Sequence, residues 1–288
     1  MALFQAHDRF QQWRFESFDV KSRLMTDLAD RLRSQKEELA KLMSLEMGKP
    51  ITQGVAEVDK CAWVCEFYAQ NAARFLADEP LQTDLEHSYK AYLPLGVILA
   101  VMPWNFPFWQ VFRFAAPTLM AGNTVLLKHA SSVLGCGEKI QELFNESGFP
   151  PGAFTHIRTS SEGVESLLRD RRCQGVSLTG STEAGRSVAA LAGHWLKKSV
   201  LELGGSDAYL VLEDADVPFA AKSLIESRMI NSGQSCIAAK RFIVHEKIKE
   251  EFLDACSAHL QTYQLGDPLA AETTCGPLAR KDLRDELQ

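Results

Sequence analysis

The feature that most constrains the fold is a regular alternation of short apolar runs with helical patterns after residue 95. Extended chain and strand are expected over 88–101, and further strands at 123–128, 175–179, 199–203, 208–212 and 241–245. Between them, helices are expected at 108–121, 135–147, 181–192, 217–229 and 247–263. Strands that alternate with helices indicate βαβ units. The predicted fold class is therefore α/β, with a Rossmann-like, mainly parallel sheet.

The first part of the chain is expected to be helical. Leucines and methionines recur at helical spacing over 8–47, and Gly48 and Pro50 mark the predicted end of that helix. A second helix is expected over 53–76, with an aromatic face formed by Trp63, Phe67, Tyr68 and Phe75.

Charge and cysteine content exclude several classes of protein. The 288 residues carry 31 Lys and Arg against 37 Asp and Glu, a net charge of -6, which argues against binding to nucleic acid or anionic lipid. The apolar stretch 96–117 is interrupted by polar residues and prolines, so no membrane span is expected. Seven cysteines without zinc-ligand spacing predict neither a disulfide scaffold nor a metal site. No secretory leader is recognisable, and we expect a cytoplasmic enzyme.

Five short motifs could carry chemistry, although each has an ordinary structural interpretation when taken alone. Cys236 lies in a polar loop with Gly233, where a thiolate could be exposed. Glu202 ends an apolar strand and precedes two glycines, as a general base could. Asn105 is held between two prolines in the sequence PWNFP, and a rigid amide can stabilise an oxyanion.

The other two motifs follow predicted strands. The segment TGSTEAG, 179–185, opens a helix whose N-terminus could receive a phosphate, although it is not the G-x-G-x-x-G fingerprint. Lys128 ends a buried strand, where doubly wound sheets bind their ligands.

Together these motifs resemble the aldehyde dehydrogenase superfamily over the whole chain. PWNFP, LLK, TGSTEAG, LELGGSD and SGQSC stand in that family's order and at similar spacings. The stretches MPWNFPFWQV, LLKHA and AAKRFIV are similar to bacterial succinate-semialdehyde dehydrogenases of the Sad type. The resemblance implies oxidation of an aldehyde, with succinic semialdehyde as the expected substrate, coupled to reduction of NADP or NAD.

The resemblance assigns the catalytic residues. Cys236 matches the nucleophile, whose attack gives a thiohemiacetal and, after hydride transfer, a thioester. Asn105 matches the oxyanion-stabilising amide, and Glu202 matches the base that activates water.

The resemblance also assigns cofactor contacts to Trp104, Lys128, Thr179, Gly180, Ser181 and Leu203. Ser131 stands where many NAD-preferring relatives place a glutamate, and a serine would not repel a 2′-phosphate. NADP is therefore expected to be accepted. The Gly-rich stretch of the family is degenerate here, because 160–163 keeps only Gly163.

For the substrate, Arg113 matches an arginine that some semialdehyde dehydrogenases place on the distal carboxylate, and Trp109 is expected to line the entrance. A structural ion pair is the alternative role for Arg113. A second arginine found in some relatives is Ile230 here, which weakens the assignment to succinic semialdehyde.

The predicted organisation is a cofactor-binding domain over 1–206 and the first, incomplete part of a catalytic domain over 207–288. A strand region near 86–97 is expected to belong to the element that forms a homodimer or homotetramer. The family chain continues further, so we expect a C-terminally truncated chain. Three alternatives remain: an aldehyde dehydrogenase of other substrate range, an acylating relative that uses coenzyme A, which Glu202 disfavours, and a truncated nucleotide-binding chain without activity.

Overall fold

A computed structural model describes residues 1–288, which divide into two compact units. The first comprises residues 1–36 and 56–202, and the second comprises 37–55 and 203–288. The division after Glu202 lies near the predicted boundary at 206. The assignment of segment 37–55 to the second unit was not expected from the sequence.

The first unit is built on a five-stranded parallel sheet, which confirms the predicted fold class. Its strands are β3 (Val97–Met102), β4 (Thr124–His129), β5 (Phe154–His156), β6 (Cys173–Thr179) and β7 (Lys198–Glu202). The strand order is β5-β4-β3-β6-β7. The order therefore reverses between β3 and β6, which is where doubly wound sheets bind ligands, beyond the carboxyl ends of the strands.

Burial along the strands follows from their positions in the sheet. The central strands β3 and β4 are buried at nearly every residue, as parallel strands covered on both faces require. Strand β7 lies at the edge, and most of its residues are exposed.

Helices surround this sheet. They are α1 (Ala2–Trp13), α2 (Phe18–Ser34), α4 (Ile51–Phe75), α5 (Trp109–Met120), α6 (Leu134–Glu146), α7 (Ser161–Arg169) and α8 (Thr182–His194). Helix α2 packs on α5 and α6, and α7 packs on α8. The first five residues of α4 belong to the second unit.

The prediction of a single helix over 8–47 was wrong. Three helices cover that region: α1, α2 and α3 (Lys36–Met47). The break between α1 and α2 is fixed by Ser17, whose hydroxyl accepts a hydrogen bond from the Val20 N–H and caps α2. Gln35 separates α2 from α3 with φ -107° and ψ 8°.

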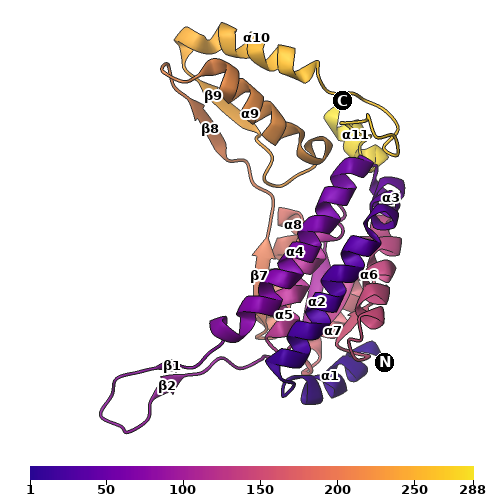
Figure 1. Cartoon of the computed structure of the whole chain (residues 1–288), viewed down its shortest axis with the longest axis vertical. Helices are drawn as coiled ribbons and strands as arrows, with labels where there is room; N and C mark the ends of the chain where they lie inside the picture. Colours follow the sequence, from indigo (N-terminus) through magenta and orange to yellow (C-terminus); the bar gives the residue numbers. More distant parts are fainter. The chain divides into compact units, whose positions relative to one another are not determined.

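The strand region expected near 86–97 contains only β2 (Tyr89–Lys90) and the first residue of β3. Strand β2 pairs antiparallel with β1 (Glu79–Pro80) in a hairpin that projects from the rest of the first unit (Figure 1). Strand β5 and helix α7 are among the elements that were not predicted. The Ser160 hydroxyl accepts from the Gly163 N–H and starts α7, so 160–163 forms a helix cap.

The second unit contains a small βαβ arrangement. Parallel strands β8 (Ala208–Val211) and β9 (Arg241–Val244) are joined through α9 (Val217–Met229), and α10 (Lys249–Leu260) packs on α9. Its core includes Val211, Leu224, Ile225 and Phe252. A short helix, α11 (Lys281–Leu287), follows. No helix in either unit is both long and apolar enough to cross a membrane.

Candidate active site

The predicted cofactor residues of the first unit follow the carboxyl ends of its strands. Trp104 lies two residues after β3, Lys128 lies at the end of β4, and Gly180 and Ser181 follow β6. Met102 pairs with His129 across β3 and β4, and Thr179 pairs with Glu202 across β6 and β7. The register therefore brings these separate motifs to one edge of the sheet, on both sides of the strand-order reversal.

The C-terminal end of the PWNFP loop is held by a histidine that the sequence analysis did not single out. His129 is buried, and its Nε2 lies 2.9 Å from the Pro107 carbonyl oxygen. Its Nδ1 accepts from the Ala130 N–H at 3.0 Å and lies 3.3 Å from the Met102 carbonyl oxygen. Burial lowers the pKa of His129 to about 4, so the ring is neutral near neutral pH.

Within the loop, the amide of Asn105 has a defined orientation. Its Oδ1 accepts from the Phe106 N–H at 3.2 Å. The Nδ2 end of the amide is the donor that an oxyanion requires. Asn105 and Trp104 are partly buried.

A buried carboxylate, also missed by the sequence analysis, fixes the helix that follows this loop. Glu57 Oε1 on α4 accepts from the Phe108 N–H at 3.0 Å and the Trp109 N–H at 2.9 Å. A negative charge at a helix N-terminus is favourable because it meets unsatisfied N–H groups and the positive end of the dipole. The only sequence signal was an acidic residue on an otherwise apolar helix face.

Arg113, the predicted substrate residue, contacts two other predicted site residues. Its Nη1 lies 3.8 Å from Glu202 Oε2, and its Nη2 donates to Thr179 Oγ1 at 3.4 Å. The ion pair is partly exposed, with 36% of the Arg113 side chain and 55% of the Glu202 side chain accessible. The structure thus joins Arg113, Thr179 and Glu202, and shows the ion pair that was the alternative role for Arg113.

The remaining cofactor positions of the first unit differ in burial. Lys128 is half-buried, and burial lowers its pKa. Ser131 is exposed at the start of the short helix η1 (Ser131–Val133). The Ser181 hydroxyl caps α8 by accepting from the Ala184 N–H at 3.2 Å, and the Gly180 N–H donates to the Glu202 carbonyl oxygen at 3.0 Å.

Cys236 and Leu203 belong to the second unit, whereas Asn105 and Glu202 belong to the first. Cys236 lies in a turn shortly before β9 and is partly exposed. The other six cysteines are buried: Cys61, Cys65, Cys136, Cys173, Cys256 and Cys275. Burial raises the pKa of Cys65 and Cys173, which keeps these thiols protonated. Cys236 is therefore the thiol that a solvent-borne substrate could reach.

The chain before Cys236 adopts an unusual backbone. Asn231 and Ser232 both have φ 55°, and Gly233 has φ 80°. Non-glycine residues in this region each cost roughly 1–3 kcal/mol and are found mainly at functional sites. The Ser232 hydroxyl accepts from the Gly276 N–H at 2.9 Å, and Gln53 Oε1 accepts from the Asn231 N–H at 3.1 Å.

After Cys236, two cations bind backbone carbonyls of the segment that follows Leu203, and one of them also binds the Cys236 carbonyl. Lys240 Nζ donates to the Cys236 carbonyl oxygen at 2.7 Å and also to the Gly205 carbonyl oxygen. Arg241 Nε donates to the Ser206 carbonyl oxygen at 2.9 Å. The SGQSC motif and the Gly205–Ser206 part of LELGGSD are therefore joined within the second unit.

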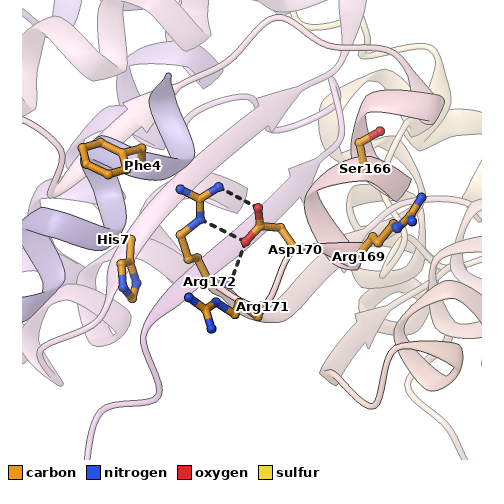
Figure 2. Close-up of a pocket in the computed structure, with 7 residues that line it drawn as sticks. All are labelled: Phe4, His7, Ser166, Arg169, Asp170, Arg171 and Arg172. Atoms are coloured by element: carbon orange, nitrogen blue, oxygen red, sulfur yellow. Dashed lines mark hydrogen bonds and ion pairs between the residues drawn. The ribbon is translucent and has the colours of Figure 1, made fainter.

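A basic depression lies at the opposite edge of the sheet in the first unit and contains none of the predicted site residues. It is lined by Phe4, His7, Ser166, Arg169, Asp170, Arg171 and Arg172 (Figure 2). Arg172 binds the Asp170 carboxylate with two guanidinium nitrogens, at 3.0 and 2.7 Å, and these bonds lower the pKa of Asp170 to about 2. These residues precede β6, whereas the predicted site follows it.

Comparison with known proteins agrees with this arrangement. The sequence profile of the protein family described as "Aldehyde dehydrogenase family" matches residues 1–288. A probable succinate-semialdehyde dehydrogenase [NADP(+)] of Synechocystis is 52% identical over 96% of this chain and 61% of its own length. The succinate semialdehyde dehydrogenase [NAD(P)+] Sad of Escherichia coli is 44% identical over 99% of this chain and 62% of its own length.

A solved structure is also similar. The succinic semialdehyde dehydrogenase of Streptococcus pyogenes in complex with NADP+ has a TM-score of 0.96 and 39% identity, over 99% of this chain and 63% of that one. The chain thus spans less than two thirds of the length of these relatives.

Proposed function

Because this chain belongs to the aldehyde dehydrogenase family, we propose that the protein oxidises an aldehyde to its carboxylate with NADP or NAD as the hydride acceptor. The observation that carries the proposal is the placement of Cys236. It is the one cysteine that is not buried, and it lies in the family's SGQSC motif after a strained backbone segment.

The residues at the carboxyl edge fit a dinucleotide. The half-buried Lys128 ammonium forms no hydrogen bond or ion pair, so it can meet a ribose hydroxyl or phosphate. The N-terminus of α8 presents backbone N–H groups beside Gly180 and Ser181, as a pyrophosphate requires. Trp104 and Thr179 lie at the same edge, and Leu203 follows β7. When bound, the nicotinamide would accept the hydride from the substrate.

Each protein residue then has a defined role. The Cys236 thiolate attacks the aldehyde carbon, and the new C–S bond leaves a negative charge on the former carbonyl oxygen. The Asn105 Nδ2 and the Cys236 backbone N–H donate to that oxygen. After loss of hydride, the substrate carbon is a thioester on Cys236. Glu202 removes a proton from water, which attacks the thioester and releases the carboxylate and the thiol.

Succinic semialdehyde is the proposed substrate, because relatives with 44–52% identity carry that name. Arg113 could bind its distal carboxylate with the guanidinium fork. The exposed Ser131 places no negative charge against a 2′-phosphate, which supports acceptance of NADP.

A homodimer or homotetramer is proposed for the whole protein, with residues 86–97 contributing. A reducing, cytoplasmic location suits seven free thiols.

The direct test is formation of NADPH and NADH with succinic semialdehyde, measured with this chain and with a version extended to the length of its relatives. Each is compared with its Cys236→Ala variant. We expect turnover in the extended form and none in its variant. Full activity of Cys236→Ala would contradict the proposed nucleophile. Turnover of other aldehydes but not of succinic semialdehyde would contradict the substrate alone. Strict dependence on coenzyme A would indicate an acylating enzyme.

A further inference from the structure

A lysine outside the five motifs contacts the predicted substrate entrance. Lys60 is an exposed residue of α4, and its ammonium lies 4.0 Å from the centroid of the Trp109 ring. A cation at this distance over an indole face is held by the ring quadrupole. The side chain is therefore directed toward the first turn of α5 instead of extending freely into solvent.

The position of Lys60 is set by the buried Glu57, one turn earlier on α4. The Glu57 carboxylate accepts from the backbone N–H groups of Phe108 and Trp109, so α4 and the start of α5 are tied at this point. Arg113 lies four residues after Trp109 on α5, and residues with this spacing share a helix face. Lys60 thus adds a second positive charge to the surface that carries Trp109 and Arg113.

The charge of Lys60 is not neutralised within the protein. Its neighbour Asp59 pairs with Lys36 at 3.1 Å, and Glu57 is bound to the start of α5. Arg113 pairs with Glu202. Lys60 has no ion pair, and its contact in the structure is the Trp109 ring. Of these two cations, Lys60 is the one that forms no ion pair in the structure, so an anion can approach it without displacing a carboxylate.

We propose that Lys60 is a specificity-determining residue that binds the distal carboxylate of the substrate, with the substrate's carbon chain against Trp109. This inference rests on the proposed function and extends it. Lys60 would be a second cation for the carboxylate, beside Arg113. The chain has Ile230 at the position where some relatives have a second arginine. The class of substrate that it selects is a short aldehyde with a carboxylate at the opposite end.

The test compares succinic semialdehyde with butanal, which has the same chain length and no carboxylate, in the protein extended to the length of its relatives. The variants are Lys60→Met and the conservative Lys60→Arg, with Lys41→Met, an exposed lysine of α3, as the matched control. We expect Lys60→Met to raise KM for succinic semialdehyde about two- to fivefold, the range of a partly exposed ion pair, with little change in kcat.

Three further results are expected. KM for butanal stays unchanged, Lys60→Arg restores most of the loss, and added salt narrows the difference between wild type and Lys60→Met. An equal rise of KM for both aldehydes would assign Lys60 a packing role on Trp109 and overturn the proposal, as would no change for either.

Failure of the proposed function is a distinct result. If the wild-type protein oxidised butanal but not succinic semialdehyde, the assignment of the carboxylate substrate would be wrong, and the role of Lys60 would be wrong with it. If the wild type oxidised both and Lys60→Met had no effect, only the role of Lys60 would be overturned.

Discussion

The guanidinium of Arg113 lies 3.8 Å from the carboxylate of Glu202, so the predicted substrate-binding residue and the predicted base form an ion pair. The pair is partly exposed, and such pairs contribute only about 0–1 kcal/mol. A substrate carboxylate could therefore compete with Glu202 for Arg113 at little cost.

This relationship makes a prediction for Arg113→Met. If Arg113 binds the distal carboxylate, kcat/KM for succinic semialdehyde falls about tenfold or more, as expected for loss of a hydrogen bond to a charged group, while kcat/KM for butanal changes much less. Steady-state kinetics with both aldehydes measures this difference. Equal losses for the two aldehydes would mean that Arg113 acts only through Glu202.

The sequence predicts which residues lie at the carboxyl ends of the strands. It does not predict which residues hold the backbone around them in place. The alternation of strands and helices places Trp104, Lys128, Gly180 and Glu202 at strand ends, and parallel pairing brings those ends to one edge. Glu57 and His129 could not be assigned in this way. Their functions depend on contacts 51 and 22 residues away in sequence, and a side chain bound to a distant backbone group leaves no local pattern.

Element boundaries were missed for local reasons. Strand β5 has three residues, and the N-terminal helical pattern over 8–47 continues in sequence across the breaks at Ser17 and Gln35. The grouping of 37–55 with the second unit depends on contacts such as the Ile51 N–H with the Pro268 carbonyl oxygen. Such a contact is invisible before the chain folds.

The buried His129 predicts a loss of stability in mild acid. Its pKa is about 4 in the folded protein because it is buried, against about 6.5 when unfolded. Between these values the unfolded chain binds more protons, so the free energy of unfolding decreases as pH falls. The full effect is about 3 kcal/mol, present above the unfolded pKa and lost as pH falls through the folded pKa.

Urea unfolding of the chain between about pH 7 and pH 4.5 measures this loss. In His129→Gln the dependence on pH should be shallower, because the titrating group is gone. His87→Gln, which replaces an exposed histidine, is the matched control and should keep the wild-type slope. Identical slopes in wild type and His129→Gln would show that other groups cause the acid sensitivity.

The positive φ angles in the turn before Cys236 lead to a further prediction. We expect activity to depend on this backbone conformation as well as on the Cys236 thiol. Gly233 has φ 80°, and a Cβ there would lie 3.1 Å from the Arg228 guanidinium. Gly233→Ala should therefore lower kcat in the extended protein and destabilise the chain by about 1 kcal/mol, because alanine disfavours positive φ. Gly193→Ala, where a Cβ meets nothing within 4 Å, is the control. Unchanged kcat in Gly233→Ala would contradict a role for this backbone conformation.

The preference between NADP and NAD is tested by introducing a carboxylate at position 131. In Ser131→Glu the new charge would face the 2′-phosphate of NADP, and like charges placed together cost enough to raise its Kd about tenfold or more. The Kd of NAD should stay the same or fall, because a carboxylate can accept from a ribose 2′-hydroxyl. Calorimetric titration of this chain with each dinucleotide measures both constants. Ser132→Glu adds the same charge one residue further along and separates a local effect from a general one. An equal loss of affinity for NADP and NAD in Ser131→Glu would remove Ser131 from the ribose site.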